Sequence, residues 1–225
     1  MASDNYLQEV SQHIRTIPGI VPAHRKASKH FYSFSNRSFA EQLAIWDTIW
    51  KNGNSFWVRV HAFFFLERNI RNGEALKQMW PVVKKWQDHV DDWGLCDALA
   101  KIYTNILVIL PDEVYDQLKK WNDDKNLWKR RQSMVSLLYY SRTKKKHPSF
   151  EKIINLIAPL LGDKEYYVQK GVGWTLRELH TVYPGKALSY FKKNIKAISS
   201  IAFTIAIEKL STIDKDKLKA LRKAK

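Results

Sequence analysis

A loose pattern repeats four times along this chain, and it limits the possible fold more than any other feature of the sequence. Each copy has an aromatic residue, a small or apolar residue five positions later and an apolar residue nine positions later. The copies are Trp57/Ala62/Leu66, Trp93/Ala98/Ile102, Trp128/Ser133/Leu137 and Tyr167/Val172/Leu176, and their aromatic residues lie 36, 35 and 39 positions apart. Such a period is typical of stacked helix pairs, in which each unit buries its apolar face only against its neighbours.

Apolar residues elsewhere also follow helical spacing, as in Ile153, Ile154, Ile157, Leu160 and Leu161. Alternating apolar and polar runs bounded by hairpin turns are absent. Six prolines are expected between helices or in their first turns: Pro18, Pro22, Pro81, Pro111, Pro148 and Pro184. The sequence therefore predicts an all-α protein, a curved α-solenoid of HEAT-like antiparallel helix pairs.

All 225 residues are expected to form a single repeat domain, because this length suits one continuous array better than two independent domains. Residues 1–50, which include Trp46 and Trp50, are expected to be helices that cap the array. Residues 214–225 alternate lysine with apolar residues and are expected to form a terminal helix that frays. The four helices that begin near the repeated aromatic residues are expected to line the concave side.

The basic charge is concentrated in the second half of the chain. Residues 1–112 hold 13 basic and 11 acidic residues, whereas residues 113–225 hold 25 basic and 11 acidic residues, and the formal net charge is +16. This excess can serve solubility, or it can attract a polyanion such as nucleic acid. Nine Trp, ten Tyr and ten Phe indicate that the charge belongs to a packed domain rather than to a disordered tail.

Several kinds of site are disfavoured by the residues present. Cys96 is the one cysteine, so the chain can form neither an internal disulfide nor a cysteine zinc cluster. The seven histidines show no metal-binding spacing and no phosphate-loop motif occurs, so we expect no metal and no other cofactor. The sequence has no run of eighteen apolar residues and no apolar signal core, which predicts a cytoplasmic protein without membrane contact.

Two segments of the predicted inner helices combine aromatic and charged residues. Trp93 and Asp97 are four positions apart and share one helical face, although a core tryptophan and a capping aspartate would have the same spacing. The segment Trp128-Lys129-Arg130-Arg131 places basic side chains around an aromatic ring at the start of a helix. Each of its arginines can donate two parallel hydrogen bonds to a phosphate, or the arginines can belong to a solvated charged face.

Gly171 and Gly173 are unusual inside a predicted helix, because each costs about 1 kcal/mol relative to Ala. A close approach by another backbone or by a ligand would offset this cost, and it would leave the Trp174 ring at the concave surface.

Further basic residues are candidates for binding a polyanion. Arg59 and Lys170 lie on predicted inner helices. Residues 142–147 read Arg-Thr-Lys-Lys-Lys-His and are expected to form a solvated loop whose Lys144 and Lys145 touch phosphates rather than perform chemistry.

Taken together, these segments resemble the AlkD-type DNA alkylation repair glycosylases, a HEAT-like repeat family. The likeness covers roughly residues 35–210 and rests on Trp93-Gly-Leu-Cys-Asp97, Trp128-Lys-Arg-Arg131-Gln-Ser-Met and Gln169-Lys-Gly-Val-Gly-Trp174-Thr-Leu-Arg-Glu178. It implies a monomeric enzyme that binds double-stranded DNA containing alkylated bases. The implied reaction is hydrolysis of the N-glycosidic bond of cationic purines alkylated at N3 or N7, without flipping the base into a pocket.

The resemblance also implies roles for individual residues. Asp97 matches the catalytic carboxylate, which would stabilise the sugar cation and orient or deprotonate water. Trp93 and Trp174 match the aromatic residues that pack against the deoxyribose of the lesion. Arg131 matches the arginine that holds the neighbouring backbone phosphate.

The sequence departs from the family pattern at two places. Gly94 stands where many members carry an acidic residue, so the helix there is expected to start or bend differently. Residues 31–35 lack the expected glycine-containing turn. Two alternatives therefore stay open: a non-catalytic binder of bent or branched DNA, and a protein-binding scaffold. Retention of the four matched residues favours the glycosylase.

Overall fold

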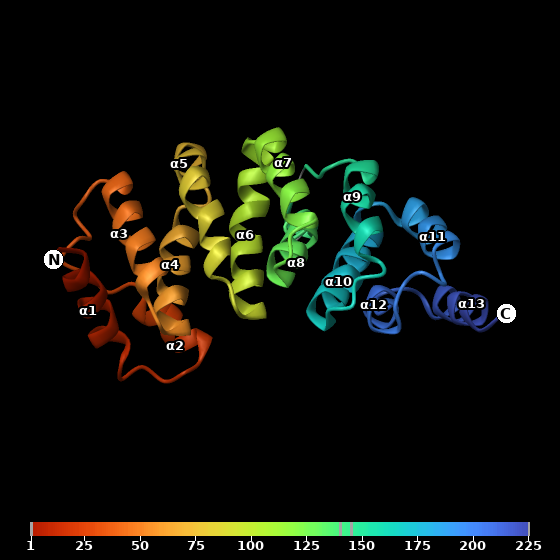
Figure 1. Cartoon of the computed structure of the whole chain (residues 1–225), viewed down its shortest axis with the longest axis horizontal. Coiled ribbons are helices and arrows are strands. Elements are labelled where there is room, and N and C mark those ends of the chain that lie inside the picture. The colour runs from red at the N-terminus through yellow and green to blue at the C-terminus, as the bar shows by residue number, and fades with distance from the viewer. Residues whose placement is uncertain (1, 140, 145, 225) are drawn as a thin grey trace. The chain divides into compact units, whose positions relative to one another are not determined.

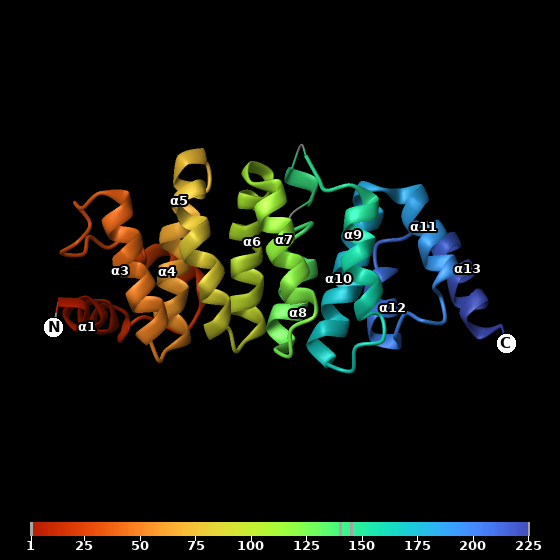
Figure 2. The same cartoon turned by 45° about the horizontal axis from the view of Figure 1, so that its top comes forward.

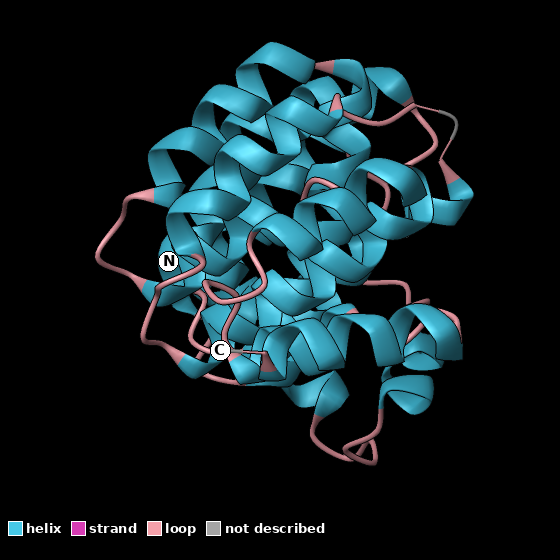
Figure 3. Cartoon of the chain, turned by 90° about the vertical axis from the view of Figure 1, so that its right-hand side faces the viewer, coloured by secondary structure: helices cyan, strands magenta, loops and turns pink. Residues whose placement is uncertain are grey.

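The computed structural model describes residues 2–139, 141–144 and 146–224, and these residues form helices and loops without any strand (Figure 3). This confirms the all-α prediction. The chain divides into two compact units, Met1–Ile109 (unit 1) and Leu110–Lys225 (unit 2). A single continuous domain stays a prediction.

Unit 1 is built from two layers of helices, one with α3 and α5 and the other with α4 and α6 (Figures 1 and 2). Its elements are α1 (Ala2–Ile14), α2 (Val21–Ala27), α3 (Phe39–Asn52), α4 (Phe56–Arg68), α5 (Gly73–Val83), the 3-10 helix η1 (Lys84–His89) and α6 (Trp93–Ile109). Helices α4 and α6, which begin near the repeated aromatic residues and were predicted to be inner helices, pack against each other, and so do α3 and α5. Helices α3 and α4 form one antiparallel pair and α5 and α6 form the next, as the repeat predicted.

The helix boundaries in unit 1 follow from local side-chain chemistry, with one exception to the sequence prediction. Ser38 and Glu41 form a reciprocal capping box at the start of α3. Asn72 caps α5 through the N–H groups of Glu74 and Ala75. Pro81 was expected between helices but lies inside α5. Proline cannot donate the helical hydrogen bond to the carbonyl of Lys77, and the α-helix ends two residues later, where the chain continues as η1.

Two stacked tryptophans join the first helix pair of unit 1 to the second. The ring centroids of Trp50 and Trp86 lie 4.5 Å apart with an interplanar angle of 12°. The Trp50 indole N–H donates to the Trp86 carbonyl at 3.1 Å, and the Trp86 indole N–H donates to the Asp47 carboxylate at 2.8 Å. Both indoles are fully buried with their N–H groups satisfied, as large aromatic residues require in a core.

A buried histidine network lies where α2 meets α4. His24 Nδ1 and His61 Nε2 are 3.1 Å apart, and His61 Nδ1 lies 3.3 Å from the Tyr32 hydroxyl oxygen. The His24 ring stacks on Trp57 with centroids 3.8 Å apart. Burial, and then the neighbouring His24, His13 and Arg68, lower the pKa of His61 to about 3, and burial also lowers the pKa of His24. Both rings are therefore neutral in the folded protein.

This network predicts that unit 1 loses stability in mild acid. The unfolded chain protonates these rings near their ordinary pKa of 6.5, whereas the folded chain does so only at lower pH. The free energy of unfolding should therefore be highest above pH 6.5 and should fall below it, by up to about 1.4 kcal/mol per pH unit for His61, and His24 acts in the same direction. Urea unfolding at about pH 7, pH 6 and pH 5 measures this slope.

One variant separates the network from other titrating groups. His61→Gln should remove the share of the slope that His61 contributes, because glutamine does not titrate. Equal slopes in the wild type and in His61→Gln would contradict the prediction.

Unit 2 repeats the two-layer arrangement. Its elements are α7 (Pro111–Asn122), α8 (Leu127–Val135), η2 (Ser141–Thr143), α9 (Phe150–Ile157), η3 (Ala158–Leu160), α10 (Tyr166–Val182), α11 (Pro184–Lys193), α12 (Ser200–Ala206) and α13 (Thr212–Lys223). The inner helix α10 packs between α8 and α12, while α7 pairs with α8 and α9 with α10. Asn126, Ser149 and Ser199 cap α8, α9 and α12 through their side chains.

The two glycines of α10 allow close approaches, as the sequence predicted. A Cβ at Gly173 would lie 2.6 Å from the Ala202 carbonyl oxygen and 2.9 Å from the Ala202 Cα, so the backbone of α12 packs directly on α10. At Gly171 the close neighbour is instead a side chain, because a Cβ there would lie 3.2 Å from Arg131 Cγ. The expected cost of glycine in a helix is thus offset by packing within unit 2.

The C-terminal segment is a docked helix rather than the frayed one that its composition predicted. Ser211 caps α13, and Leu218 on its inner side is 1% exposed. The Arg222 guanidinium donates to the carbonyls of Ile195 and Ile198, at 2.7 Å in both cases. These contacts supply the tertiary packing that a short helix needs to be stable.

Candidate nucleic-acid interface

Helix α6 begins with an exposed aromatic residue one turn before a carboxylate. Trp93 is its first residue and is 53% exposed. Asp97, four positions later, is half-buried and shares a helix face with Trp93. The Asp92 carboxylate accepts a hydrogen bond from the Gly94 N–H at 2.6 Å and thereby caps the helix. A start or bend that differs from other family members, as expected from Gly94, stays a prediction.

A second exposed aromatic ring lies beside the start of α6. Phe56 is the first residue of α4 and is 39% exposed, and a Cβ at Gly94 would lie 3.5 Å from its ring. Phe56 and Trp93 therefore mark the same edge of unit 1. Phe56 was not among the predicted site residues, although it directly precedes Trp57, the first residue of the repeat.

Arg59 is largely engaged within unit 1. Its guanidinium Nη1 lies 3.3 Å from the Asp91 carboxylate, and its Nε donates to the Trp50 carbonyl at 3.4 Å. These contacts tie α3 and α4 to the segment that leads into α6. Arg59 thus helps to hold the start of α6, and its predicted role in binding a polyanion would require it to exchange Asp91 for a phosphate.

In unit 2, Arg131 lies against the first turn of α10. It is 6% exposed, and its Nη1 donates to the Tyr167 carbonyl at 2.8 Å. The absence of a side chain at Gly171 lets the guanidinium lie this close, since a Cβ there would be 3.3 Å from Nη1. Arg131 and Gly171, which belong to separate motifs of the sequence, are therefore in direct contact.

Aromatic rings line the same face of α10. The Trp128 and Tyr167 ring centroids are 5.1 Å apart, at the starts of α8 and α10. Further along α10, the half-buried Trp174 lies 5.5 Å from Tyr139, centroid to centroid. We call these four aromatic residues, together with Arg131, the α8–α10 face. Tyr139 carries no sequence signal, because it follows the end of α8.

Lys170 also belongs to this side of α10, four positions before Trp174. Its ammonium nitrogen lies 5.3 Å from the centroid of the Tyr166 ring, which is 52% exposed. A cation over an exposed aromatic ring stays available to solvent and to anions, because such a contact is weak at the surface.

Lys129 and Arg130 have partners within unit 2. Arg130 Nε donates to the Asp163 carboxylate at 2.6 Å, and its Nη1 donates to the carbonyls of Asp124 and Lys125, at 2.8 Å in both cases. Lys129 pairs with Asp124 at 3.3 Å. A hydrogen bond from the Asn126 N–H, and then Lys129 and Arg130, lower the pKa of Asp124. Arg130 thus joins the loops that precede α8 and α10.

The basic loop after α8 is anchored by a buried carboxylate. The Ser141 hydroxyl donates to Glu178 of α10 at 2.6 Å, and both residues are buried. Lys144, within the loop, is half-buried. Lys145 was also predicted to touch phosphates, but it lies outside the described residues.

The sequence model of a DNA alkylation repair enzyme family matches residues 8–210, nearly the whole chain. This chain belongs to that DNA alkylation repair enzyme family. A comparison with curated proteins gave no match. Membership of a DNA repair family indicates a role in DNA alkylation repair and implies DNA binding.

Solved structures support the fold of this DNA alkylation repair family member. AlkD2 from Streptococcus mutans is 17% identical with a TM-score of 0.59, over 98% of this chain and 97% of that one. A predicted DNA alkylation repair enzyme from Enterococcus faecalis is 18% identical with a TM-score of 0.69, over 92% and 96%. The protein smu.31 from Streptococcus mutans UA159 is 16% identical with a TM-score of 0.58, over 98% of both chains.

Two further features of this family member concern membranes and metals. Among the described helices, none is both long and apolar enough to cross a membrane. Within the same part of the chain, no group of three or more His, Cys, Asp or Glu side chains is placed to hold a metal ion.

Proposed function

We propose that this chain is a DNA glycosylase, which hydrolyses the N-glycosidic bond of purines alkylated at N3 or N7 in double-stranded DNA without flipping the base. The observation that carries the proposal is the exposed Trp93 ring one turn before Asp97, at the start of an inner helix. Membership of the DNA alkylation repair enzyme family supports the class of lesion.

The proposed chemistry uses the charge of the lesion itself. A purine alkylated at N3 or N7 is cationic, so it leaves with the electron pair of the glycosidic bond and needs no proton from the enzyme. Positive charge develops on the sugar, where the Asp97 carboxylate would stabilise it. A water oxygen then bonds to C1′, and its proton passes to Asp97 or to solvent. The electron-rich face of Trp93 would favour the same cation.

Unit 2 would hold the DNA backbone around the lesion. In the proposal, Trp174 packs against the deoxyribose, and Lys170 and Lys144 bind phosphates nearby. Arg131, which is 6% exposed and donates to the Tyr167 carbonyl, would have to turn its guanidinium toward the DNA to hold the adjacent phosphate. Action of residues from both units on the same lesion, and action as a monomer, are parts of the proposal.

The other predicted phosphate contacts would need a change of partner. Arg59, Lys129 and Arg130 already bind carboxylates within their own units. Each would have to exchange that partner for a phosphate. Lys145 stays a prediction from the sequence.

Base release from methylated duplex DNA tests the proposed function. The purified protein should free N3- and N7-methylated purines, identified by mass, and should release nothing from the same duplex without methylation. Absence of release, together with a preference for branched over linear duplex, would replace the glycosylase with a non-catalytic DNA binder.

A further inference from the structure

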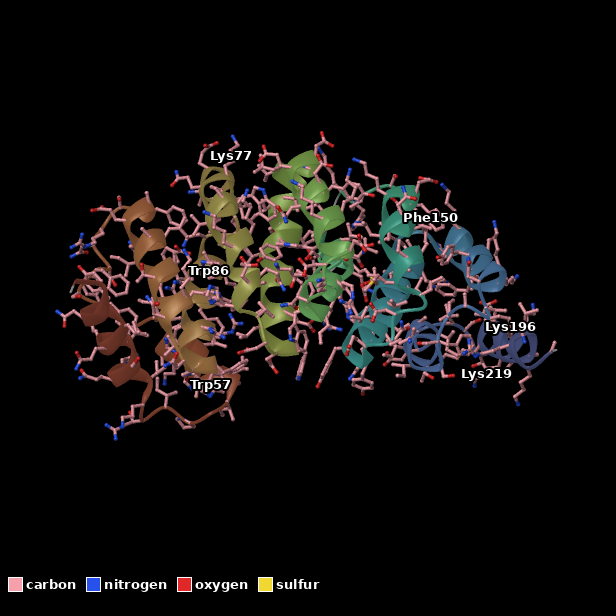
Figure 4. The ribbon with its side chains drawn as sticks, in the orientation of Figure 1. Trp57, Lys77, Trp86, Phe150, Lys196 and Lys219 are labelled. Atoms are coloured by element: carbon pink, nitrogen blue, oxygen red, sulfur yellow. The ribbon has the colours of Figure 1, made fainter. Side chains whose placement is uncertain are left out.

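Lysines gather at the C-terminal end of unit 2, on helices that the proposed reaction does not use. Residues 184–224 contain ten basic and three acidic residues. Within the described part of the chain, four exposed lysines of α11 and α13 form no ion pair: Lys192, Lys193, Lys219 and Lys223. We call these four the C-terminal lysine surface. Figure 4 labels Lys219 on α13 and Lys196 in the segment that follows α11.

The two helices that carry this surface pack against each other, and α13 is also tied to the segment that follows α11. The Lys196 ammonium donates to the carbonyl of Arg222 at 2.9 Å and also to the carbonyl of Ala224. The Arg222 guanidinium reaches back to the carbonyls of Ile195 and Ile198. Because the backbone is already ordered, binding a ligand here would restrict only the lysine side chains, which keeps the entropic cost of binding low.

The helix dipoles explain only part of this charge. Lys192 and Lys193 lie in the last turn of α11, and Lys223 lies in the last turn of α13, where cations offset the negative end of a helix. Lys219 stands a full turn before Lys223, and Lys215 another turn before that. The dipole effect fades within the last turn, so the row of three lysines along α13 needs another explanation.

The spacing of this row suits a nucleic-acid strand. Residues four apart in a helix rise about 6 Å, and a strand of duplex DNA carries one phosphate per roughly 3.4 Å of axis. Successive lysines of the row can therefore reach about every second phosphate of one strand. Exposed apolar residues of α13, such as Ile213, lie at other angles around the helix.

We infer that the C-terminal lysine surface binds the phosphate backbone of duplex DNA, in a segment flanking the one held by the α8–α10 face. The inference rests on the proposed function for the position of the duplex, but it depends on no catalytic residue. Its consequence is a binding site longer than the lesion itself, with an affinity that responds strongly to salt.

Two double variants, each of which removes two positive charges, test this surface. Lys219→Gln/Lys223→Gln removes two charges from it, and Lys119→Gln/Lys120→Gln removes two charges from the outer helix α7 of the same unit. Affinity is measured by fluorescence anisotropy over a range of salt concentrations, on a short duplex and on one about 10 bp longer, which is roughly one helical turn. Vesicles of anionic phospholipid and single-stranded RNA serve as alternative ligands.

The surface variant should bind the longer duplex about tenfold more weakly at low salt, and the slope of log affinity against log salt should fall by about two. The short duplex should bind both variants equally, and base release from it should stay at the wild-type rate. Equal slopes for the two variants on the longer duplex would overturn the inference, as would a loss confined to vesicles or RNA. If the wild type releases no base but the slopes still differ, the surface stands and the glycosylase proposal fails.

Discussion

Asp97→Asn should lower the rate of base release by about a hundredfold or more while leaving the affinity for duplex DNA nearly unchanged. Asparagine has the shape of aspartate but carries no negative charge, so it cannot stabilise the sugar cation or accept a proton from water. DNA binding depends on cations elsewhere in the chain and should persist. Single-turnover release from methylated duplex, together with anisotropy on the same duplex, measures both quantities.

Asp92 provides a matched control at the start of the same helix. Asparagine and aspartate cap helices about equally well, so Asp92→Asn should keep the hydrogen bond from Gly94 and should release bases at the wild-type rate. Wild-type release by Asp97→Asn would remove this carboxylate from the mechanism, although the chain could still bind DNA.

Gly173→Ala should lower the free energy of unfolding of unit 2 by about 1–3 kcal/mol. The added Cβ would lie 2.6 Å from the Ala202 carbonyl oxygen and 2.8 Å from Ile205 Cβ. Backbone atoms cannot rotate away as a side chain can, so α10 and α12 would have to separate. This cost outweighs the gain in helix propensity of about 1 kcal/mol. Urea unfolding followed by circular dichroism measures the change.

Two other glycines of unit 2 make the comparison specific. Gly185 lies in α11 with nothing within 4 Å of its added Cβ, so Gly185→Ala should be neutral or stabilising. Gly171→Ala should have an intermediate effect, because its near neighbour is the side chain of Arg131, which can shift. Equal losses of unfolding free energy in Gly173→Ala and Gly185→Ala would show that the contact with α12 contributes little to stability.

The starts of the predicted inner helices could be located from the sequence, because the repeat places an aromatic residue at the beginning of each one. Trp57, Trp93, Trp128 and Tyr167 are the first or second residues of α4, α6, α8 and α10. Stacking buries corresponding positions of every copy, so similar residue types recur at these positions in the sequence. Helix ends are less constrained: α8 stops at Val135, and Leu137, the last member of its copy, is buried outside the helix.

Contacts between distant side chains could not be predicted. The need for a close approach at Gly171 and Gly173 followed from helix propensity, but nothing in the sequence identified Arg131 and α12 as the neighbours. The ion pair of Arg130 could not be predicted either, because its partner Asp163 lies 33 positions away in the sequence. An ion pair of this kind depends on which loops the fold brings together, and no local pattern records that.

The frayed helix expected at the C-terminus shows how composition can mislead. Lysine side chains favour solvent, and a short isolated helix is only marginally stable in water. In the structure, Arg222 and Lys196 each donate to backbone carbonyls of the other's segment and hold α13 on the unit. Charged side chains here stabilise the packing instead of opposing it.

The aromatic residues that begin the inner helices bring neighbouring helix ends to a common edge. Phe56 lies beside the first turn of α6 in unit 1, and Trp128 lies beside the first turn of α10 in unit 2. Each helix N-terminus carries a positive partial charge of about half an elementary charge, because its first N–H groups have no partner within the helix. In unit 2, α8 is capped by the neutral side chain of Asn126 rather than by a carboxylate. Part of the positive potential beside Trp128 therefore comes from the backbone, and substitution of every lysine would leave it in place.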